Sequence, residues 1–209
     1  MAGIFRKRKR VLALGGGSAR GLCNIGVLRV LERQFGRGSL PFDGVIGTSI
    51  GSLIGAAYCL GMDPERLEKK TVGFTWPKLF DLGMNPTGLI KGDRLEEIIK
   101  DCVGEGSFSD MRIPFALTTT NIETGEEYIH EEGDLVKLIR ASCSWPGIFS
   151  AVKVDGKMLV DGGLRNSVPT KWAYKGGATM VVAVDPGFAV MKGKMNNMLQ
   201  TTVQAMQIM

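Results

Sequence analysis

A serine that could act as a nucleophile lies in the motif Gly-Thr-Ser-Ile-Gly at residues 47–51. An apolar run before the motif predicts a strand, and one after it predicts a helix, which is the setting of a nucleophile elbow. Gly47 and Gly51 stand two residues from Ser49 on either side, where larger side chains would crowd so tight a turn. The turn presents the serine oxygen at the carboxyl end of the strand, beside the helix N-terminus. We therefore predict Ser49 as a nucleophile for acyl transfer.

A serine hydroxyl needs a base, and the sequence contains only one histidine. His130 lies in a charged, hairpin-like stretch, and we expect it to be a structural histidine at the surface rather than a member of a triad. A carboxylate could serve instead, because burial raises the proton affinity of a carboxylate toward that of a useful base.

Asp161 is the carboxylate whose position fits this role best. It ends a predicted strand, so it should emerge at the same edge of the sheet as Ser49. Gly162 and Gly163 follow it and let the chain turn away without crowding the carboxylate. Asp155 is the competing acid, but it falls in a predicted hairpin turn before that strand. We predict Asp161 as the base.

Acyl transfer also requires donors for the developing oxyanion, and a glycine-rich loop between a predicted strand and helix could supply them. Residues 15–21 read Gly-Gly-Gly-Ser-Ala-Arg-Gly. The backbone N–H groups of Gly15, Gly16 and Gly17 should point outward with a helix dipole behind them, and Arg20 adds a positive charge. We predict these four residues as the oxyanion hole.

The same loop has a rival interpretation as a nucleotide-binding turn. A dinucleotide fingerprint would require glycine where Arg20 stands, and its acidic residue should close the second strand, whereas Asp43 opens it. A phosphate-binding Walker loop would need Gly-Lys-Ser/Thr, which does not follow. A nucleotide-binding α/β module stays open as the alternative to an enzyme.

The elements that must position these residues alternate between strands and helices, which predicts an α/β layered fold. The continuous β-branched run near residue 180 favours a central parallel strand. A hairpin strand is expected at Glu127–His130. The other predicted strands are Val11–Leu14, Phe42–Ile46, Phe115–Thr120, Lys157–Val160 and Met180–Val184, and the helices are Leu22–Arg33, Ile50–Leu60, Arg94–Cys102 and Leu135–Ser142.

Charge and composition separate a basic N-terminal arm, residues 1–10, from a single domain over residues 11–209. Arg6–Arg10 carry five positive charges, and without them the chain has 21 basic and 21 acidic residues. The arm is either a solvated tail or a peripheral contact with anionic membrane. No motif supports nucleic-acid binding. The more polar residues 62–109 are expected to form a lid-like helical insertion.

The four cysteines contain no C-x-x-C pair and the chain has one histidine, so we expect neither a zinc site nor an iron–sulfur cluster. No secretory leader or apolar run of membrane-spanning length is visible, so we expect a cytoplasmic protein with reduced thiols. The chain ends inside a predicted amphipathic helix from Met195 to Met209, which indicates that the domain is incomplete at its C-terminus.

Three blocks together resemble the patatin-like phospholipase family, and most closely its short bacterial members. They are the glycine-rich loop at 15–21, the serine motif at 47–51, and Asp161-Gly162-Gly163 followed by Asn166 and Pro169. Two positions depart from the family pattern: Asn24 stands where many members have histidine, and Ser150-Ala151 replaces a proline-containing turn. These departures bear on lid packing or specificity.

The resemblance implies a three-layer α/β sandwich whose mostly parallel central sheet is flanked by helices. It also implies a Ser49–Asp161 dyad that hydrolyses lipid or phospholipid acyl esters without metal or cofactor. The amides of Gly16 and Gly17, with Arg20 nearby, would hold the oxyanion. A catalytically silent lipid-binding scaffold is a further alternative.

Overall fold

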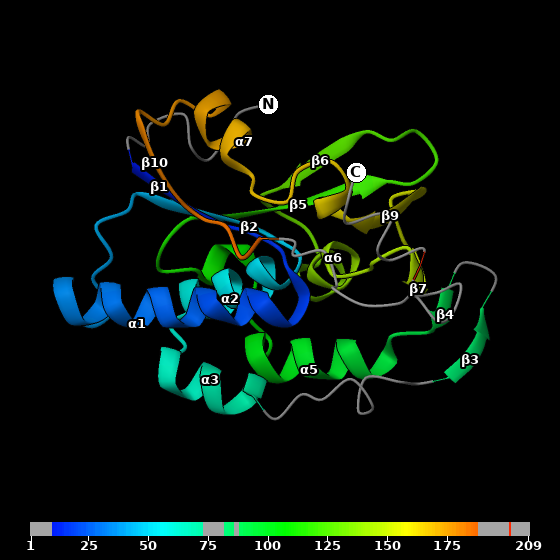
Figure 1. The fold of residues 1–209 in the computed structure, drawn as a ribbon, viewed down its shortest axis with the longest axis horizontal. Coiled ribbons are helices and arrows are strands. Elements are labelled where there is room, and N and C mark those ends of the chain that lie inside the picture. Colours follow the sequence, from blue (N-terminus) through cyan, green and yellow to red (C-terminus); the bar gives the residue numbers. More distant parts are fainter. Residues whose placement is uncertain (1–9, 73–81, 86–87, 188–200, 202–209) are drawn as a thin grey trace.

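The computed structural model of the 209-residue chain describes residues 10–72, 82–85, 88–187 and 201 (Figure 1). Most of the basic arm and nearly all of the predicted C-terminal helix lie outside the described residues. Arg10, the last residue of the arm, begins the first strand and forms an ion pair with Asp43. None of the helices in the described ranges has the length and apolar character needed to cross a bilayer.

A mixed sheet forms the centre of the fold. Its described strands are β1 (Arg10–Leu14), β2 (Gly44–Thr48), β5 (Phe115–Asn121), β6 (Glu127–His130), β8 (Val152–Val154), β9 (Lys157–Asp161) and β10 (Met180–Val184). They are ordered β10-β1-β2-β5-β9-β8, and β6 pairs with β5 outside this path. Pairing is parallel from β10 through β5, whereas β6, β8 and β9 pair antiparallel.

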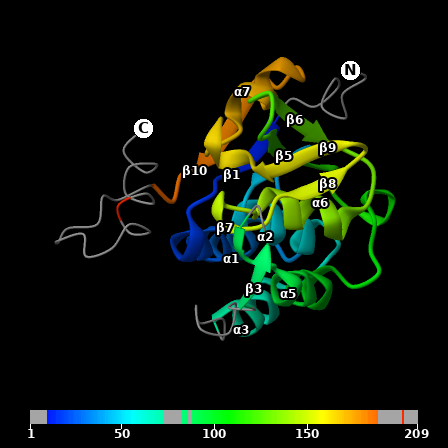
Figure 2. The ribbon, with the colours of Figure 1, turned by 90° about the vertical axis from the view of Figure 1, so that its right-hand side faces the viewer.

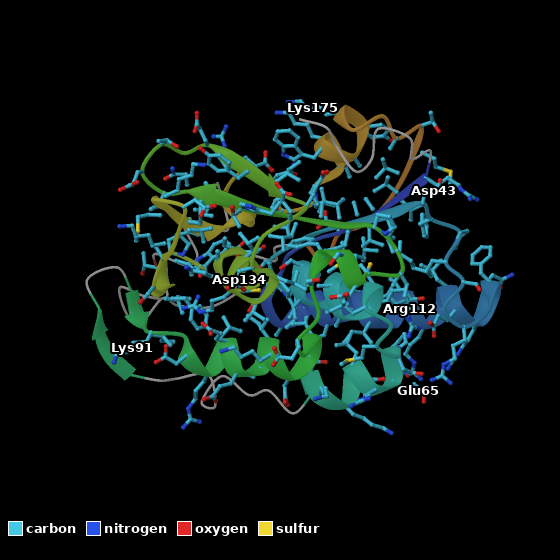
Figure 3. All side chains as sticks on the ribbon, turned by 180° about the vertical axis from the view of Figure 1, so that it is seen from behind. Asp43, Glu65, Lys91, Arg112, Asp134 and Lys175 are labelled. Carbon is cyan, nitrogen blue, oxygen red and sulfur yellow. The ribbon has the colours of Figure 1, made fainter. Side chains whose placement is uncertain are left out.

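Helices cover both faces of this sheet, so the domain has three layers, as expected (Figures 1 and 2). One face carries α1 (Cys23–Phe35), α2 (Ile50–Cys59), α3 (Pro64–Val72), α5 (Asp93–Val103) and α6 (Leu135–Ser142), and the other carries α7 (Thr170–Lys175). In Figure 3, Glu65 of α3 and Lys175 of α7 lie on opposite sides of the sheet.

The alternation of side chains along β1 explains how one buried strand supports both layers. Leu12 and Leu14 pack into the large core under α1 and α2, whereas Val11 and Ala13 pack toward Ala173 of α7. Successive strand residues point to opposite faces, so a strand covered on both sides must be apolar throughout. The predicted strand Val11–Leu14 is of this kind, because all four residues are fully buried.

The helix predictions hold where the apolar pattern is strong. Leu135–Ser142 has the predicted bounds, and α2 ends one residue before the predicted Leu60. Every residue of α2 from Gly51 to Cys59 is buried, because this helix lies between the sheet and the other helices of its layer. Gly61 follows with φ +96°, the left-handed conformation expected of a helix-terminating glycine.

Part of the predicted insertion at 62–109 packs onto the main core. Leu67 of α3 and Ile99 and Cys102 of α5 belong to the same buried cluster as the sheet residues. Within the insertion, β3 (Leu82–Asn85) pairs with β4 (Gly88–Ile90), which pairs with β7 (Gly147–Phe149) in a second, small sheet. Lys91, labelled in Figure 3, lies between β4 and α5. The lid role of this segment stays a prediction.

The expected central position of Met180–Val184 is wrong. The segment is a parallel strand with the predicted bounds, but β10 lies at the edge of the sheet, beside β1. Met180 is 47% exposed and Val182 is 38% exposed. A continuous apolar run indicates a strand able to be buried on both faces. Which neighbours then cover it depends on the rest of the chain.

Candidate active site

Ser49 lies between the last residue of β2 and the first residue of α2, with φ 54° and ψ −131°. A residue with a Cβ atom rarely adopts such a conformation, which costs about 1–3 kcal/mol. Both flanking glycines are required by close backbone approach. A Cβ atom on Gly47 would lie 2.5 Å from the carbonyl oxygen of Gly51, and one on Gly51 would overlap the carbonyl oxygen of Leu14.

The hydroxyl of Ser49 is held by a buried carboxylate. Ser49 Oγ donates a hydrogen bond of 2.7 Å to Oδ2 of Asp161. The backbone N–H of Gly163 donates to the other carboxylate oxygen, Oδ1, also at 2.7 Å. Asp161 is only 1% exposed. The pair predicted from two distant motifs is therefore brought into direct contact, and the turn after Asp161 orients the carboxylate.

The two residues meet because their strands end at neighbouring positions along one edge of β5. β2 runs parallel to β5, and its last residue, Thr48, pairs with Thr118. β9 runs antiparallel to β5, and its last residue, Asp161, pairs with Thr119. β6 occupies the opposite edge of β5 beside both positions. The carboxyl ends of β2 and β9 therefore approach each other end to end, where the hydroxyls of Thr48 and Thr118 share a hydrogen bond of 2.7 Å.

Burial gives this carboxylate the proton affinity of a base that works near neutral pH. It raises the pKa of Asp161 to about 7, and the hydrogen bonds from Ser49 and Gly163 lower that pKa by less. The low-dielectric surroundings disfavour the charged form, whereas donors stabilise it. A group with such a pKa both accepts and returns a proton readily at neutral pH. The arrangement is chemically suited to activate the Ser49 hydroxyl.

A family model described as patatin-like phospholipase matches residues 12–174, a range that includes Ser49 and Asp161. The chain belongs to the patatin-like phospholipase family.

Relatives of this patatin-like domain are much longer proteins. It is 36% identical over 202 residues to lysophospholipase NTE1 of Scheffersomyces stipitis, covering 94% of this chain and 13% of that protein. Identity is 36% over 184 residues to the patatin-like phospholipase domain-containing protein ZK370.4 of Caenorhabditis elegans, and 33% over 186 residues to neuropathy target esterase sws of Drosophila melanogaster. Each of these two matches covers 84% of this chain and 13% of the relative.

Solved structures support the patatin-like fold independently. The crystal structure of VipD from Legionella pneumophila superposes with a TM-score of 0.60 at 14% identity, over 75% of this chain and 46% of that chain. Similarity at this level of identity bears on the fold alone.

The glycine-rich loop of the patatin-like domain lies beside the elbow, but two of its amides are already used. Gly15 N–H donates to the carbonyl of Val184 at 2.9 Å, and Gly16 N–H donates to the carbonyl of Ser167 at 2.8 Å. The prediction that these two amides belong to the oxyanion hole therefore needs correction. The chain leaves β1 between two neighbouring segments, and its first two residues after the strand continue to pair with backbone groups.

The outward part of the loop differs. Among the described residues, the N–H groups of Gly17 and Ser18 have no backbone acceptor, and both residues lie in the half-buried to exposed turn before α1. Gly16 approaches the elbow so closely that a Cβ atom there would lie 3.0 Å from Cβ of Ser49. Arg20 follows in the same turn, and its guanidinium donates to the carbonyl of Gly187 at 3.3 Å.

Asn24 supports this loop, a role that sequence reasoning did not assign to it. Its side chain is fully buried and donates from Nδ2 to the carbonyl of Gly15 at 3.1 Å. The expectation that this departure bears on lid packing or specificity stays a prediction. The second departure, Ser150, follows β7 and donates from both N–H and hydroxyl to the carbonyl of Ile90 on β4.

His130 is half-buried rather than at the surface, which corrects the sequence-based expectation. Its Nε2 lies 2.7 Å from the hydroxyl of Thr119, and burial lowers its pKa to about 4. Both oxygens of Asp161 are occupied by Ser49 and Gly163. His130 is thus a neutral structural histidine at pH 7, and the described residues do not form a Ser–His–Asp triad.

Three serines that no sequence pattern singled out contact the dyad. Ser142 Oγ accepts the N–H of Ser49 at 2.8 Å, and Ser52 Oγ donates to the carbonyl of Ser49 at 2.6 Å. The carbonyl of Ser144 accepts the N–H of Asp161 at 3.0 Å. For Ser142 and Ser144, the only available indication was a polar run at the end of a predicted helix.

Across residues 10–72, 82–85 and 88–187, no three His, Cys, Asp or Glu side chains cluster as metal ligands.

Proposed function

We propose that this patatin-like domain hydrolyses acyl esters of lipids, with Ser49 as nucleophile and Asp161 as base. The observation that carries the proposal is the 2.7 Å hydrogen bond between a serine in an elbow conformation and a buried carboxylate with a pKa of about 7. Membership of the patatin-like phospholipase family supports an ester substrate.

In the first half of the reaction, Asp161 takes the hydroxyl proton as Ser49 Oγ attacks the ester carbonyl carbon. The carbonyl oxygen becomes an oxyanion, and the amides of Gly17 and Ser18 are the donors we assign to it, with Arg20 nearby as a positive charge. The tetrahedral intermediate then collapses. The alcohol or lysolipid leaves with the proton from Asp161, and an acyl-Ser49 ester remains.

In the second half, Asp161 is again a carboxylate and accepts a proton from water. The hydroxide attacks the acyl-Ser49 carbonyl, and the same donors hold the second oxyanion. Collapse releases the fatty acid, and the proton on Asp161 returns to Ser49 Oγ. No atom is transferred to or from a cofactor in this cycle.

We propose monoacyl phospholipids as the first substrate class to test, because two of the relatives that the chain matches are named lysophospholipase and neuropathy target esterase. We also retain the proposed contact of the basic arm with anionic membrane. Arg10 itself pairs with Asp43, so the contact would fall to residues 6–9. Binding to vesicles with and without phosphatidylserine, at low and high salt, tests this contact.

A fluorophosphonate probe and a lysophosphatidylcholine assay test the proposed hydrolase. Ser49→Ala should abolish both covalent labelling and fatty-acid release. Ser109→Ala, at an exposed serine on η2 (Phe108–Asp110), should retain both. Retention of activity by Ser49→Ala would overturn the proposal. Vesicle binding by a wild-type protein that is never labelled would favour the silent scaffold, and tight binding of NAD or ATP would favour a nucleotide module.

A further inference from the structure

The backbone of Ser49 is held on both sides by buried hydroxyl groups from different helices. Ser142, the last residue of α6, is 0% exposed and accepts the Ser49 N–H through Oγ at 2.8 Å. Ser52, in the first turn of α2, is also 0% exposed and donates from Oγ to the Ser49 carbonyl at 2.6 Å. The carbonyl has additional partners, the N–H groups of Ser52 and Leu53.

The N–H of Ser49 depends on Ser142 because regular secondary structure gives it no acceptor. Strand pairing of β2 with β5 ends at Thr48, and α2 begins at Ile50. The positive φ of Ser49 takes its amide out of both hydrogen-bonding patterns. A backbone N–H that loses its acceptor is left unsatisfied, and at Ser49 this adds to the strain of the positive-φ conformation.

The same segment also holds the second member of the dyad. The carbonyl of Ser144 accepts the N–H of Asp161 at 3.0 Å. Arg140 is 4% exposed, and its guanidinium bonds to the hydroxyl of Ser144 and to the carbonyl of Gly92. Residues 142–144 therefore contact the backbone of both Ser49 and Asp161, and a buried arginine fixes the segment in place.

We propose that Ser142 is a positioning residue for the reaction, because its hydroxyl holds the Ser49 amide and thereby keeps Ser49 Oγ within reach of Asp161. This inference rests on the proposed function. It also assigns the Ser49 amide to the elbow rather than to the oxyanion, which leaves stabilisation of the oxyanion to the glycine-rich loop.

The inference has a pH signature that loss of stability alone would not produce. The hydrogen bond from Ser49 lowers the pKa of Asp161, so a Ser49 that moves away lets this pKa rise. The other groups near Asp161 change little over the assay range. Burial raises the pKa of the Cys143 thiol to about 12 and lowers that of His130 to about 4, and Arg140 contributes a positive charge from α6.

Two variants separate the hydrogen bond from the space that the side chain fills. Ser142→Ala removes the acceptor and leaves a small void, whereas Ser142→Cys nearly conserves the volume but provides only a weak acceptor. Both should lower kcat and the rate of fluorophosphonate labelling about ten- to hundredfold. KM should change little, and the acidic limb of the kcat profile should move to higher pH.

The matched control is Ser150→Ala, which deletes another buried hydroxyl, one bonded to the Ile90 carbonyl, and touches neither dyad residue. It should keep kcat within about twofold of wild type. The inference is overturned if Ser142→Ala loses no more activity than this control, if Ser142→Cys matches wild type, or if activity falls without a shift of the acidic limb. Failure of the proposed function is distinguished by an active Ser49→Ala variant.

Discussion

Ser49 Oγ and Asp161 Oδ2 lie 2.7 Å apart, yet the two segments that carry them contribute to the site in different ways. The elbow depends on backbone shape: a positive φ, and two glycines whose missing side chains let three backbone segments approach closely. Asp161 has φ −52° and ψ 129°, an ordinary conformation, and it owes its pKa of about 7 to burial. Substitution of either elbow glycine should therefore lower the stability of the fold. Substitution of Asp161 should instead abolish the chemistry and raise the stability, because a buried charge is removed.

The largest effect should follow from Asp161→Asn. The amide cannot accept the Ser49 proton, so kcat should fall about 10³-fold or more while the protein stays folded. Asp155→Asn is the matched control, because Asp155 lies in the turn between β8 and β9 and asparagine tolerates its positive φ. Hydrolysis of a chromogenic ester by both variants, after circular dichroism, measures the difference. Equal activities would remove Asp161 from the mechanism.

Gly51→Ala should break the other side of the comparison. The added methyl group would overlap the carbonyl oxygen of Leu14, so β1 and α2 must separate. We expect a loss of about 3 kcal/mol or more in the free energy of unfolding, together with the loss of labelling. Gly26→Ala, at an exposed position of α1 where a Cβ atom meets nothing within 4 Å, should instead raise the free energy of unfolding by about 0.5–1 kcal/mol. Urea unfolding of both variants checks this contrast.

The stability of Asp161→Asn should exceed that of wild type at alkaline pH. The native state keeps a proton on Asp161 up to about pH 7, whereas the unfolded chain releases it near the ordinary value of 3.8. Native protein thus binds more protons in this window, and wild-type stability falls as pH rises through it. The variant lacks this loss and should gain up to about 4 kcal/mol at pH 8 and little at pH 4. A variant less stable than wild type at both pH values would contradict the burial argument.

The pH dependence of wild-type activity should show the same group. Because only the carboxylate accepts a proton, kcat/KM should fall about tenfold per pH unit below an apparent pKa of about 7. Steady-state hydrolysis between pH 5 and 9, with an uncharged ester, measures the limb. A kcat/KM that stays constant down to pH 5 would mean that Asp161 is far better solvated in the protein at work than its 1% exposure indicates.

The smallest effect should follow from His130→Ala. The imidazole contacts Thr119 rather than Asp161, and its pKa of about 4 keeps it neutral at assay pH. We expect kcat/KM to change less than about threefold. A loss like that of Asp161→Asn would restore the triad interpretation, because removal of a true base strips the serine of its proton acceptor.

The sequence by itself determined the elements whose cause is local. A tight turn between strand and helix requires glycines two residues from the serine, and the periodic apolar pattern of α6 defined its bounds. The three blocks that resemble the patatin-like phospholipase family also predict Ser49, Asp161 and the glycine-rich loop as site residues. The turn and the helix depend on residues near one another in the chain, so backbone sterics and side-chain periodicity are sufficient to predict them, whereas the three blocks were assigned by resemblance.

Only the tertiary structure decided how these pieces meet. β2 and β9 approach end to end along one edge of β5, one parallel and one antiparallel to it. The sequence predicts Ser49 and Asp161 at the same edge of the sheet but does not predict this arrangement of their strands. Strand direction, the partners of the Gly15 and Gly16 amides, the edge position of β10 and the contact of Ser142 with Ser49 all involve residues distant in sequence. Local propensity does not encode such pairings. They arise when the whole core is buried and every enclosed backbone group must find a partner.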